Sequence, residues 1–297
     1  MAPFYVIIVT YNGEKWINRC LSSVFNSTIK AIPIVVDNGS KDNTLNIIKE
    51  KFPQTIIMES GGNVGFGQAN NKAIQYAIEK GAEYVYLLNQ DAWVDNNVFE
   101  VLLSLMNKYP DYGIISPIQI TANRTKIDKN FLHNDISDER CPNLKSDLLL
   151  GNLKDIYELY VAMAAHWMLR LTCVKRIGLF SDAFPHYGED SNLMMRMHYH
   201  KIKIGLSPHV FGVHDREDRV NSAQKYAYLY YIQSLIGLHD IFNDSTKLRA
   251  RIVLRSIIKI LIIKEVSFKQ KLDYLLMIVR CIYPARHYRK KYKETNE

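Results

Sequence analysis

The clearest indication of the architecture is the segment Tyr84-Val-Tyr-Leu-Leu, followed by Asn89-Gln-Asp-Ala-Trp-Val-Asp-Asn96. Five aromatic and aliphatic residues end abruptly in amide and carboxylate side chains. A short apolar run bounded in this way predicts a strand buried on both faces, as in a parallel sheet covered by helices. Such sheets place ligands at the carboxyl ends of their strands, where Asp91 stands. One carboxylate beside Asn89 and Gln90 suits a hard divalent cation that takes its other ligands from substrate phosphates and water.

The alternative interpretation of this stretch is a strand that ends in a polar turn, with Asp95 capping the next helix. We prefer that interpretation for Asp95, because residues 97–108 have helical spacing and Pro110 stops them. For Asp91 we favour a ligand role, since the loops that precede it supply the rest of a nucleotide site.

The composition is that of an ordinary globular protein. The chain has 297 residues, 47% of them hydrophobic and 23% charged, which allows one large domain or two modest ones. The four cysteines form no Cys-x-x-Cys pair, which argues against a zinc site or a disulfide scaffold and fits a reducing compartment. There is no basic-then-apolar leader, and no apolar segment reaches the ~18–20 residues needed to span a bilayer. We therefore expect a protein that works inside the cell.

Strands and helices alternate through the first 120 residues. Apolar runs predict strands at 4–10, 32–36, 55–59 and 84–88. Helical spacing covers 14–25, 43–52, 68–80 and 97–108. The pattern predicts a doubly wound α/β sheet, mostly parallel, with helices on both faces. From 118 to 155 the sequence is polar and predicts loops with a short hairpin over the sheet.

Polar residues follow three of these strands, as Thr10-Tyr-Asn12, Asp37-Asn38 and Asn89-Gln-Asp91. In an open parallel sheet these strand ends share one edge, so the three clusters should converge on one crevice. Asp37 could accept hydrogen bonds from a base, and Tyr11 could stack on it. Glycines at 61, 62, 65 and 67 let backbone approach a ligand closely, although a flexible connector is the alternative. Neither a dinucleotide fingerprint nor a Walker loop is present.

A second informative stretch is Phe184-Pro-His-Tyr-Gly-Glu-Asp-Ser-Asn-Leu-Met-Met-Arg196. It delivers the adjacent acids Glu189 and Asp190 to the start of a helix. Acids are favoured at helix N-termini, so capping is one explanation. The other explanation is a general base whose pKa is tuned by its apolar setting. The residues alone favour neither explanation over the other. His214, after another apolar strand, is either structural or a ligand of a metal or diphosphate.

Together these stretches resemble glycosyltransferase family 2, especially its bacterial rhamnosyltransferase-like members. The resemblance covers roughly residues 4–216. It is carried by Val6-Ile-Ile-Val-Thr-Tyr-Asn12, Val35-Val-Asp-Asn-Gly-Ser40, Asn63-Val-Gly-Phe-Gly-Gln-Ala-Asn-Asn71, Leu87-Leu-Asn-Gln-Asp91, Gly188-Glu-Asp-Ser-Asn-Leu-Met-Met-Arg196 and His214.

The resemblance implies a GT-A fold with a nucleotide-sugar half at 1–120, an acceptor half at 121–220 and further helices at 221–297. It also implies inverting transfer of a hexose from a nucleoside-diphosphate sugar, with Mg²⁺ or Mn²⁺ on the diphosphate. The donor that the resemblance implies is dTDP-rhamnose or a UDP-sugar, and the implied acceptor is lipid-linked or a saccharide in O-antigen, capsule or cell-wall synthesis.

Site residues carry over by position. Asp190 would be the catalytic base, and Asp91 and His214 the metal ligands. The resemblance and the strand ends place the donor on Thr10, Tyr11, Asn12, Asp37, Asn38, Gly65, Asn70, Gln90 and Asp91. The acceptor is expected on Trp167, Tyr187 and Glu189. Asp37, Asp91 and Asp190 should meet around one pocket.

Three positions depart from the family pattern. Trp93 stands where a second metal carboxylate often sits, which makes metal binding either weak or dependent on His214. Asn192 replaces a common acid two positions after the base. Asn70 stands where many members have arginine.

Beyond the resemblance, the C-terminal region predicts basic amphipathic helices. Lys247, Arg251, Arg255 and Lys259 recur every fourth residue, and 286–293 is strongly basic. Such helices suit an anionic membrane surface, which would place the protein on the inner face of the cell membrane. A helical hairpin on the core or in a homodimer interface is the alternative. Nucleic acid fits poorly, because the excess charge is terminal and no nucleic-acid motif appears.

Two rival functions stay open from the sequence. A sugar nucleotidyltransferase shares the architecture but needs a glycine-rich loop containing Arg and Lys after the first strand, and Tyr11-Asn-Gly-Glu14 differs from it. A non-catalytic homologue that serves as a scaffold is suggested by Trp93 and Asn192. The presence of both Asp91 and Asp190 speaks against the scaffold.

Overall fold

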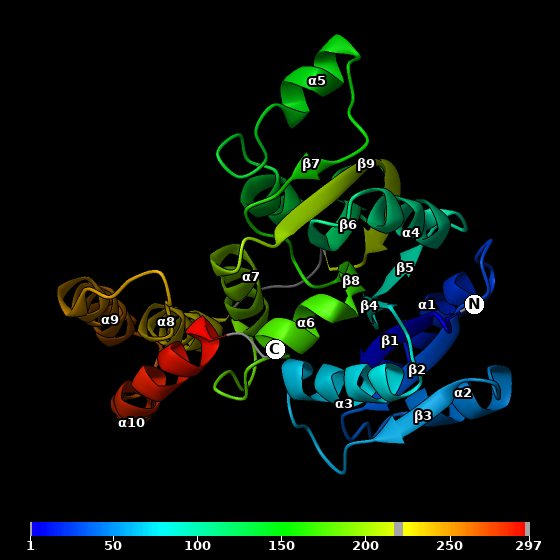
Figure 1. The fold of residues 1–297 in the computed structure, drawn as a ribbon. Helices are drawn as coiled ribbons and strands as arrows, with labels where there is room; N and C mark the ends of the chain where they lie inside the picture. Colours follow the sequence, from blue (N-terminus) through cyan, green and yellow to red (C-terminus); the bar gives the residue numbers. More distant parts are fainter. Residues whose placement is uncertain (1, 217–221, 295–297) are drawn as a thin grey trace. The chain divides into compact units, whose positions relative to one another are not determined.

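The computed structural model describes residues 2–216 and 222–294 (Figure 1). The described residues form two compact units: residues 2–175 with 202–216, and residues 176–201 with 222–294. This grouping follows packing rather than donor and acceptor roles. The functional halves expected at 1–120 and 121–220 therefore stay a prediction.

The first unit is built on one mixed sheet with the strand order β3-β2-β1-β4-β8-β6-β9-β5, and β7 pairs with β9. Its parallel part comprises β1 (Tyr5–Thr10), β2 (Ile32–Asp37), β3 (Ile56–Glu59) and β4 (Tyr84–Asn89). β8 (His166–Arg170) then runs antiparallel to β4. The remaining strands are β5 (Ala92–Val94), β6 (Tyr112–Ile120), β7 (Tyr157–Glu158) and β9 (Lys203–His214). The predicted α/β sheet with helices on both faces is confirmed. Besides the parallel pairs among β1 to β4, β6 pairs with β9 in parallel, and the other pairs are antiparallel.

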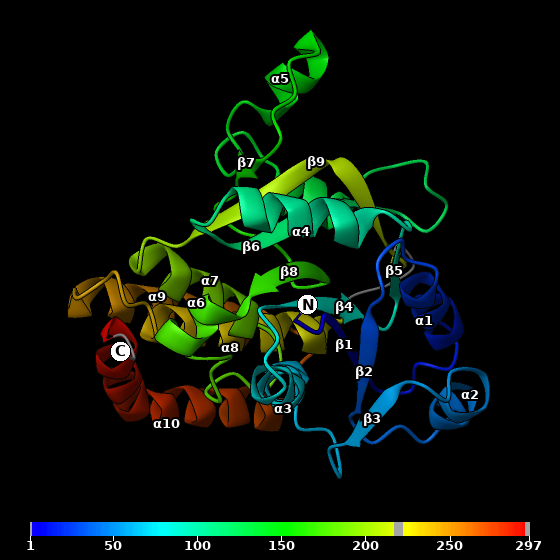
Figure 2. The ribbon, with the colours of Figure 1, turned by 45° about the vertical axis from the view of Figure 1, so that its right-hand side comes forward.

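Helices cover both faces of the parallel strands because consecutive residues of these strands, whose side chains point to opposite faces, are mostly apolar. In β1, Val6 and Ile8 share a core cluster with α1 (Ile17–Phe25) and α4 (Val98–Lys108). On the neighbouring residue Tyr5, the ring contacts Tyr76 of α3 (Phe66–Glu79). Figure 2 shows α3 and α4 on opposite sides of β1 and β4. The remaining early helix is α2 (Thr44–Lys51).

Between β6 and β8 the sequence predicted loops and a short hairpin. In place of a regular hairpin, the structure has an isolated antiparallel bridge between Ile120 and Ile127. The segment also contains a π-helical turn, η1 (Phe131–Asp135), and a short helix, α5 (Leu144–Leu150), which the polar composition did not predict. Three leucines at the end of α5 are exposed: Leu148, Leu149 and Leu150.

The second unit is helical. It begins at Arg176, near the end of α6 (Leu171–Ile177). It contains α7 (Glu189–Tyr199), α8 (Ala223–Leu238), α9 (Thr246–Ile262) and α10 (Phe268–Lys293). Its apolar core joins Phe184 to Tyr231 and Leu235 of α8, Ile260 of α9 and Ile278 of α10. The helices predicted after residue 221 are therefore present, and the basic segment 286–293 continues α10.

A buried arginine fixes α7 within this unit. Arg196 has no exposed surface, and its guanidinium donates to the carbonyls of Ile177, Gly178 and Leu179 at 2.7–2.9 Å. The guanidinium also lies 4.3 Å from the ring centre of Tyr292 in α10. Burial lowers the pKa of Arg196 to about 10, so the side chain is a cation whose charge is offset by carbonyl dipoles. α7 is thereby tied to the end of α10.

Candidate functional site

The polar strand ends meet at one edge of the sheet, as predicted. The register of the parallel strands sets Thr10 beside Asp37 and Val9 beside Asn89. The Thr10 hydroxyl donates to Asp37 Oδ1 at 3.1 Å, and the N–H groups of Gly39 and Ser40 donate to Asp37 Oδ2 at 3.0 Å. A carboxylate has about four acceptor positions, so this buried group keeps capacity for one more donor.

Gln90 holds the loop after β1. Its amide bonds the backbone of Tyr11 in both directions: Oε1 accepts the N–H at 2.9 Å, and Nε2 donates to the carbonyl at 3.2 Å. Gly13 makes room for this amide, because a Cβ there would lie 2.3 Å from Gln90 Oε1. The Tyr11 ring is 46% exposed beside this fixed backbone. The arrangement leaves part of Tyr11 accessible to a ligand.

Asn12 and Asn38 join loops to each other. The N–H of Asn12 donates to Ser40 Oγ, and its Oδ1 accepts from the N–H of Lys41. Asn38 accepts from the Ser60 hydroxyl and donates to the carbonyl of Gly65. Both side chains therefore shape the loops, and their predicted nucleotide contacts stay predictions.

The glycine loop packs closely on the turn after β2. Gly39 has a φ of 89°, and a Cβ there would lie 3.2 Å from Gly62 Cα. Gly65, with a φ of 86°, precedes α3. Asn70 lies inside α3, buried, and donates to the carbonyl of Phe66. The loop is therefore an ordered part of this edge, while donor contacts of Gly65 and Asn70 stay predictions.

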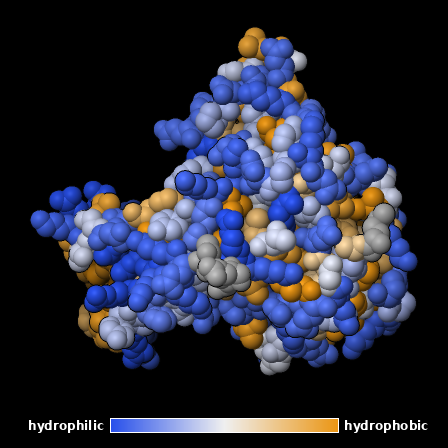
Figure 3. All heavy atoms as spheres, viewed as in Figure 1, coloured by the Kyte–Doolittle hydropathy of each residue, from blue (hydrophilic) through white to orange (hydrophobic). Residues whose placement is uncertain are grey.

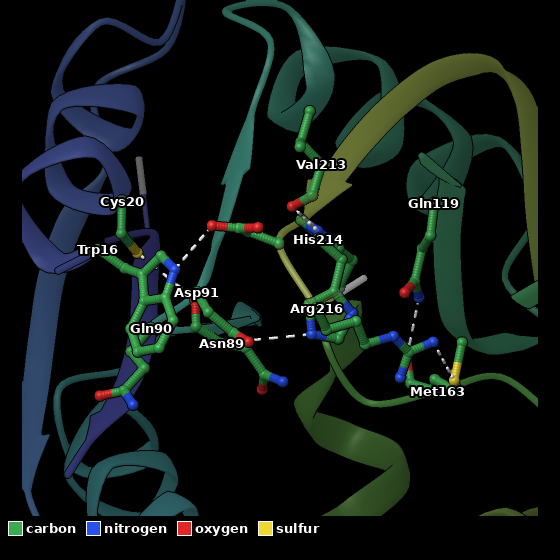
Figure 4. A network of polar contacts seen from close by, with 12 residues as sticks. Trp16, Cys20, Asn89, Gln90, Asp91, Gln119, Met163, Val213, His214 and Arg216 are labelled. Carbon is green, nitrogen blue, oxygen red and sulfur yellow. Dashed lines mark hydrogen bonds and ion pairs between the residues drawn. The ribbon is translucent and has the colours of Figure 1, made fainter. Parts of the chain in front are cut away.

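Asp91 and His214 form a buried pair at the same edge (Figure 4). Their side chains are 2% and 3% exposed, and His214 Nε2 lies 3.6 Å from Asp91 Oδ1. Neither ring nitrogen of His214 makes a hydrogen bond within the described chain. A buried imidazole without hydrogen bonds is costly, and a cation shared with Asp91 would satisfy it. The pair therefore fits a divalent metal.

The protein supplies few ligands to such a metal. Among the residues that the structure describes, no group of three or more His, Cys, Asp or Glu side chains gathers in a metal-binding arrangement. Mg²⁺ and Mn²⁺ commonly take one or two protein ligands and complete their shell with water and phosphate oxygens. The donor set of one carboxylate and one imidazole is consistent with that mode.

Trp93 closes the place where a second carboxylate was expected by the family pattern. Its ring is 5% exposed, and the guanidinium of Arg19 lies 3.7 Å from the ring centre. In β5, Trp93 pairs with Val213, next to His214. The position expected for a second carboxylate ligand therefore holds an indole in cation–π contact with Arg19.

A second histidine, absent from the predicted site, supports the strand that carries His214. His166 in β8 donates through Nε2 to the carbonyl of Val213 at 3.0 Å and accepts from the hydroxyl of Tyr86 at Nδ1, also at 3.0 Å. Burial and the neighbouring His214 lower the pKa of His166 to about 3, so the ring is neutral. Gly212 allows the contact, because a Cβ there would lie 2.7 Å from the His166 ring. The signal in the sequence was a single polar residue inside an apolar strand.

Two further contacts fix the chain just after His214. The indole of Trp16 donates to Asp215 Oδ2 at 2.8 Å. Arg216 forms a two-point ion pair with Asp128, with one contact at 2.8 Å. Burial raises the pKa of Asp128, but hydrogen bonds from Arg216 and from the N–H of Phe131 outweigh it and hold the pKa below its usual value.

The acid pair of the second unit lies at the start of α7. Gly188, with a φ of 89°, precedes it, and a Cβ there would lie 2.9 Å from Ile232 and Phe184. Asp190 Oδ1 accepts from the N–H of Ser191 at 2.7 Å. Glu189 is 4% exposed, and its Oε2 has no hydrogen bond in the described chain.

These two environments separate the roles of the acids. Burial, and then the charge of Asp190, raise the pKa of Glu189 to about 8. Burial also raises the pKa of Asp190, while the N–H and hydroxyl of Ser191 stabilise its anion. The raised pKa of Glu189 predicts that this side chain keeps its proton at neutral pH.

The two aromatic residues predicted for the acceptor differ in exposure. Tyr187, with a φ of 64°, is half-buried, and its ring lies 6.4 Å from that of Tyr228. Trp167 has no exposed surface and pairs with Leu87 in the sheet. Tyr187 offers a surface to a ligand, whereas Trp167 is part of the core. Both acceptor contacts stay predictions.

The mixed α/β sheet with polar strand ends is the architecture that the resemblance to the GT-A fold predicts. The family model described as Glycosyl transferase family 2 matches residues 5–177, from β1 to α6. The chain belongs to glycosyltransferase family 2. The match ends before Glu189 and Asp190, whose roles are therefore argued from their chemistry and the resemblance of their motif.

Two relatives illustrate the range of the family. The low-salt glycan biosynthesis hexosyltransferase Agl10 of Haloferax volcanii is 25% identical over 290 residues, which cover 95% of this chain and 89% of the relative. The N-acetylglucosaminyl-diphospho-decaprenol L-rhamnosyltransferase of Mycobacterium tuberculosis is 25% identical over 122 residues, 38% of this chain and 40% of that protein. Both relatives are glycosyltransferases, as the sequence predicted for this chain.

Solved structures confirm the GT-A fold. The mannosyltransferase PcManGT of Pyrobaculum calidifontis, in complex with GDP-Man and Mn²⁺, superposes with a TM-score of 0.60 at 16% identity, covering 98% of this chain and 84% of that one. Residues 1–349 of S. aureus TarS in complex with UDP give a TM-score of 0.56 at 14% identity, covering 98% and 89%. At these identities the likeness establishes the fold alone.

Proposed function

We propose that the protein is an inverting glycosyltransferase that moves a hexose from a nucleoside-diphosphate sugar to a lipid-linked or saccharide acceptor in the synthesis of a surface polysaccharide. The observation that carries the donor side is the buried Asp91–His214 pair at the edge where Thr10, Tyr11 and Asp37 converge. Asp37 keeps one acceptor position for the edge of a pyrimidine, and the exposed ring of Tyr11 can stack on it. The donor is dTDP-rhamnose or a UDP-sugar, and the mycobacterial relative's name favours rhamnose.

Asp91 and His214 would hold Mg²⁺ or Mn²⁺. When bound, such a cation offsets the charge that grows on the leaving diphosphate. Asp190 accepts the proton of the acceptor hydroxyl, whose oxygen bonds to the anomeric carbon as the bond from that carbon to the diphosphate breaks. The configuration at the carbon inverts in one displacement. Glu189, protonated at neutral pH, donates a hydrogen bond to the acceptor.

The test of this mechanism is Asp190→Asn. We expect transfer to fall by roughly a thousandfold or more, because the base is lost, while donor affinity stays near the wild-type value. Thermal stabilisation by dTDP and UDP, with and without Mn²⁺, would measure the nucleotide affinity and also identify the nucleobase of the donor. The anomeric configuration of the product, observed by NMR, tests inversion. Wild-type turnover by the variant would remove Asp190 from the mechanism.

A non-catalytic scaffold is the second candidate, and the observation in its favour is Trp93 at the position of a second metal carboxylate. The two functions differ in one measurement. A scaffold would bind the nucleotide without releasing it from any donor sugar, whereas an enzyme would release nucleoside diphosphate, at least by slow hydrolysis.

A further inference from the structure

The positive charge of the chain is concentrated at its C-terminal end. Residues 245–294 hold 14 of the 38 lysines and arginines but only 3 of the 30 acidic residues. The rest of the chain therefore contributes none of the net charge of +8. A surface of this kind attracts anionic partners over a distance of about 8 Å at physiological salt.

α10 adds an apolar stripe to this charge. Its side chains lie on one face by helical spacing (i, i+4, i+8, i+11, i+15) and are 44–85% exposed: Phe268, Leu272, Leu276, Val279 and Tyr283. The opposite face of the helix is buried, at Ile278, Ala285 and Tyr292. The exposed stripe is therefore not needed for the core of the second unit.

Cations border the stripe. Helical spacing puts Lys290 in line with it, and Arg280 and Arg286 at its sides; all three are exposed. Figure 3 shows hydrophobic and hydrophilic residues intermixed on the surface formed by α9 and α10, at the left of the view. A helix with exposed leucines, an exposed aromatic ring and flanking cations suits the interface between lipid head groups and acyl chains.

We propose that this face of α10 docks on an anionic membrane, with the apolar stripe inserted among the lipids and the cations on the head-group phosphates. No helix of the described chain is long and apolar enough to cross a bilayer. The inference deepens the proposed function and rests on it for the lipid-linked acceptor. A second copy of the chain is the poorer occupant, because a two-fold contact would set these like charges against one another.

The experiment is flotation of the full chain with vesicles of phosphatidylcholine, alone or in an equimolar mixture with phosphatidylglycerol. We expect the protein to float only with the vesicles that contain phosphatidylglycerol, and to float less as the salt concentration rises. The variant Leu276→Ser/Val279→Ser/Tyr283→Ser and the variant Arg280→Glu/Arg286→Glu/Lys290→Glu should each bind at least about tenfold more weakly.

Each variant has a matched control in the first unit. Leu148→Ser/Leu149→Ser/Leu150→Ser removes three exposed leucines of α5, and Lys30→Glu/Lys49→Glu/Lys51→Glu makes the same change in charge. We expect both controls to float like wild type. Equal losses in a control and its partner variant would overturn the assignment to α10.

Other outcomes also overturn the proposal. They are wild-type flotation on phosphatidylcholine alone, no flotation at all, and a concentration-dependent dimer that the α10 variants convert to monomer. Thermal stabilisation by donor nucleotide is measured on the same samples and should be unchanged in every variant. If the wild type showed no donor binding, that result would count against the proposed function but would not affect the docking result.

Discussion

At the scale of single residues, the strongest constraint is Asp91. Its carboxylate faces an imidazole whose nitrogens have no hydrogen bonds in the described chain. We expect Asp91→Asn to lower transfer by roughly a hundredfold or more, because the cation loses its anionic ligand. In the wild type, EDTA should weaken donor binding measured by calorimetry, and in the variant EDTA should change it little.

A matched substitution checks that the effect is local. Asp95, four residues further on, pairs with exposed Arg124 at 2.8 Å. Asp95→Asn should leave donor binding and its response to EDTA unchanged and cost less than about 1 kcal/mol of stability. If Asp91→Asn bound donor and metal as tightly as Asp95→Asn, the pair with His214 would not be a metal site.

Glu189 predicts a pH dependence of stability. Its pKa in the folded protein is about 8, above its ordinary 4.5, so the folded state binds the proton more tightly than the unfolded state. The stability of the protein should therefore fall as pH rises from about 4.5 to about 8, by an amount on the order of a few kcal/mol. Glu189→Gln, which stays neutral, should lack this slope.

The measurement is the melting temperature of both proteins across that range. The melting temperature of the variant should rise relative to that of the wild type as pH increases. Glu50→Gln, at an exposed position of α2, provides the control and should follow the wild type. Parallel curves for Glu189→Gln and wild type would show that Glu189 is ionised when folded.

At the scale of elements, the turn after β1 and the end of β4 act as one piece. Gly13 leaves room for the Gln90 amide, which fixes the Tyr11 backbone. Gly13→Ala should displace that amide and weaken donor binding by about tenfold, since Tyr11 would lose its fixed position. In Gln90→Ala the added methyl has no amide to displace, so Gly13→Ala should cost little further.

Calorimetric donor affinities of the two single variants and the double variant complete this cycle. Strongly non-additive losses are expected. Additive losses would mean that Gly13 and Gln90 act on the site separately.

The elements also show what the sequence could predict. The strand ends were predictable because an apolar run followed by Asp37 or Asp91 is a local pattern, and parallel strands bring such ends together. His166 and Asp128 were not, because their partners Val213 and Arg216 lie 47 and 88 residues away and no local period connects them. The antiparallel place of β8 between β4 and β6 is likewise set by packing across the sheet.

At the scale of the whole molecule, the units combine two kinds of organisation. The first is a sheet whose edge is fixed by side-chain-to-backbone hydrogen bonds between loops, such as those of Gln90 and Asn38. The second is a helical unit whose acid pair sits on α7, and α7 is held by Arg196 and by the end of α10. The C-terminal helices are therefore structural parts of the unit that carries Asp190, besides offering an exposed face.

This dependence predicts the outcome of shortening the chain. Ending it after residue 244 removes Ile260, Ile278 and Tyr292, which share the core of the second unit or cover Arg196. Each large buried apolar side chain contributes about 2–5 kcal/mol, so their combined loss exceeds what a unit of this size can spare. We expect the shortened chain to lose transfer, to bind a hydrophobic dye and to unfold without a cooperative transition for this unit. The charge variant Arg280→Glu/Arg286→Glu/Lys290→Glu should keep the wild-type melting curve. Cooperative unfolding and full transfer by the shortened chain would show that α9 and α10 are an appendage, and that α7 holds its acids without them.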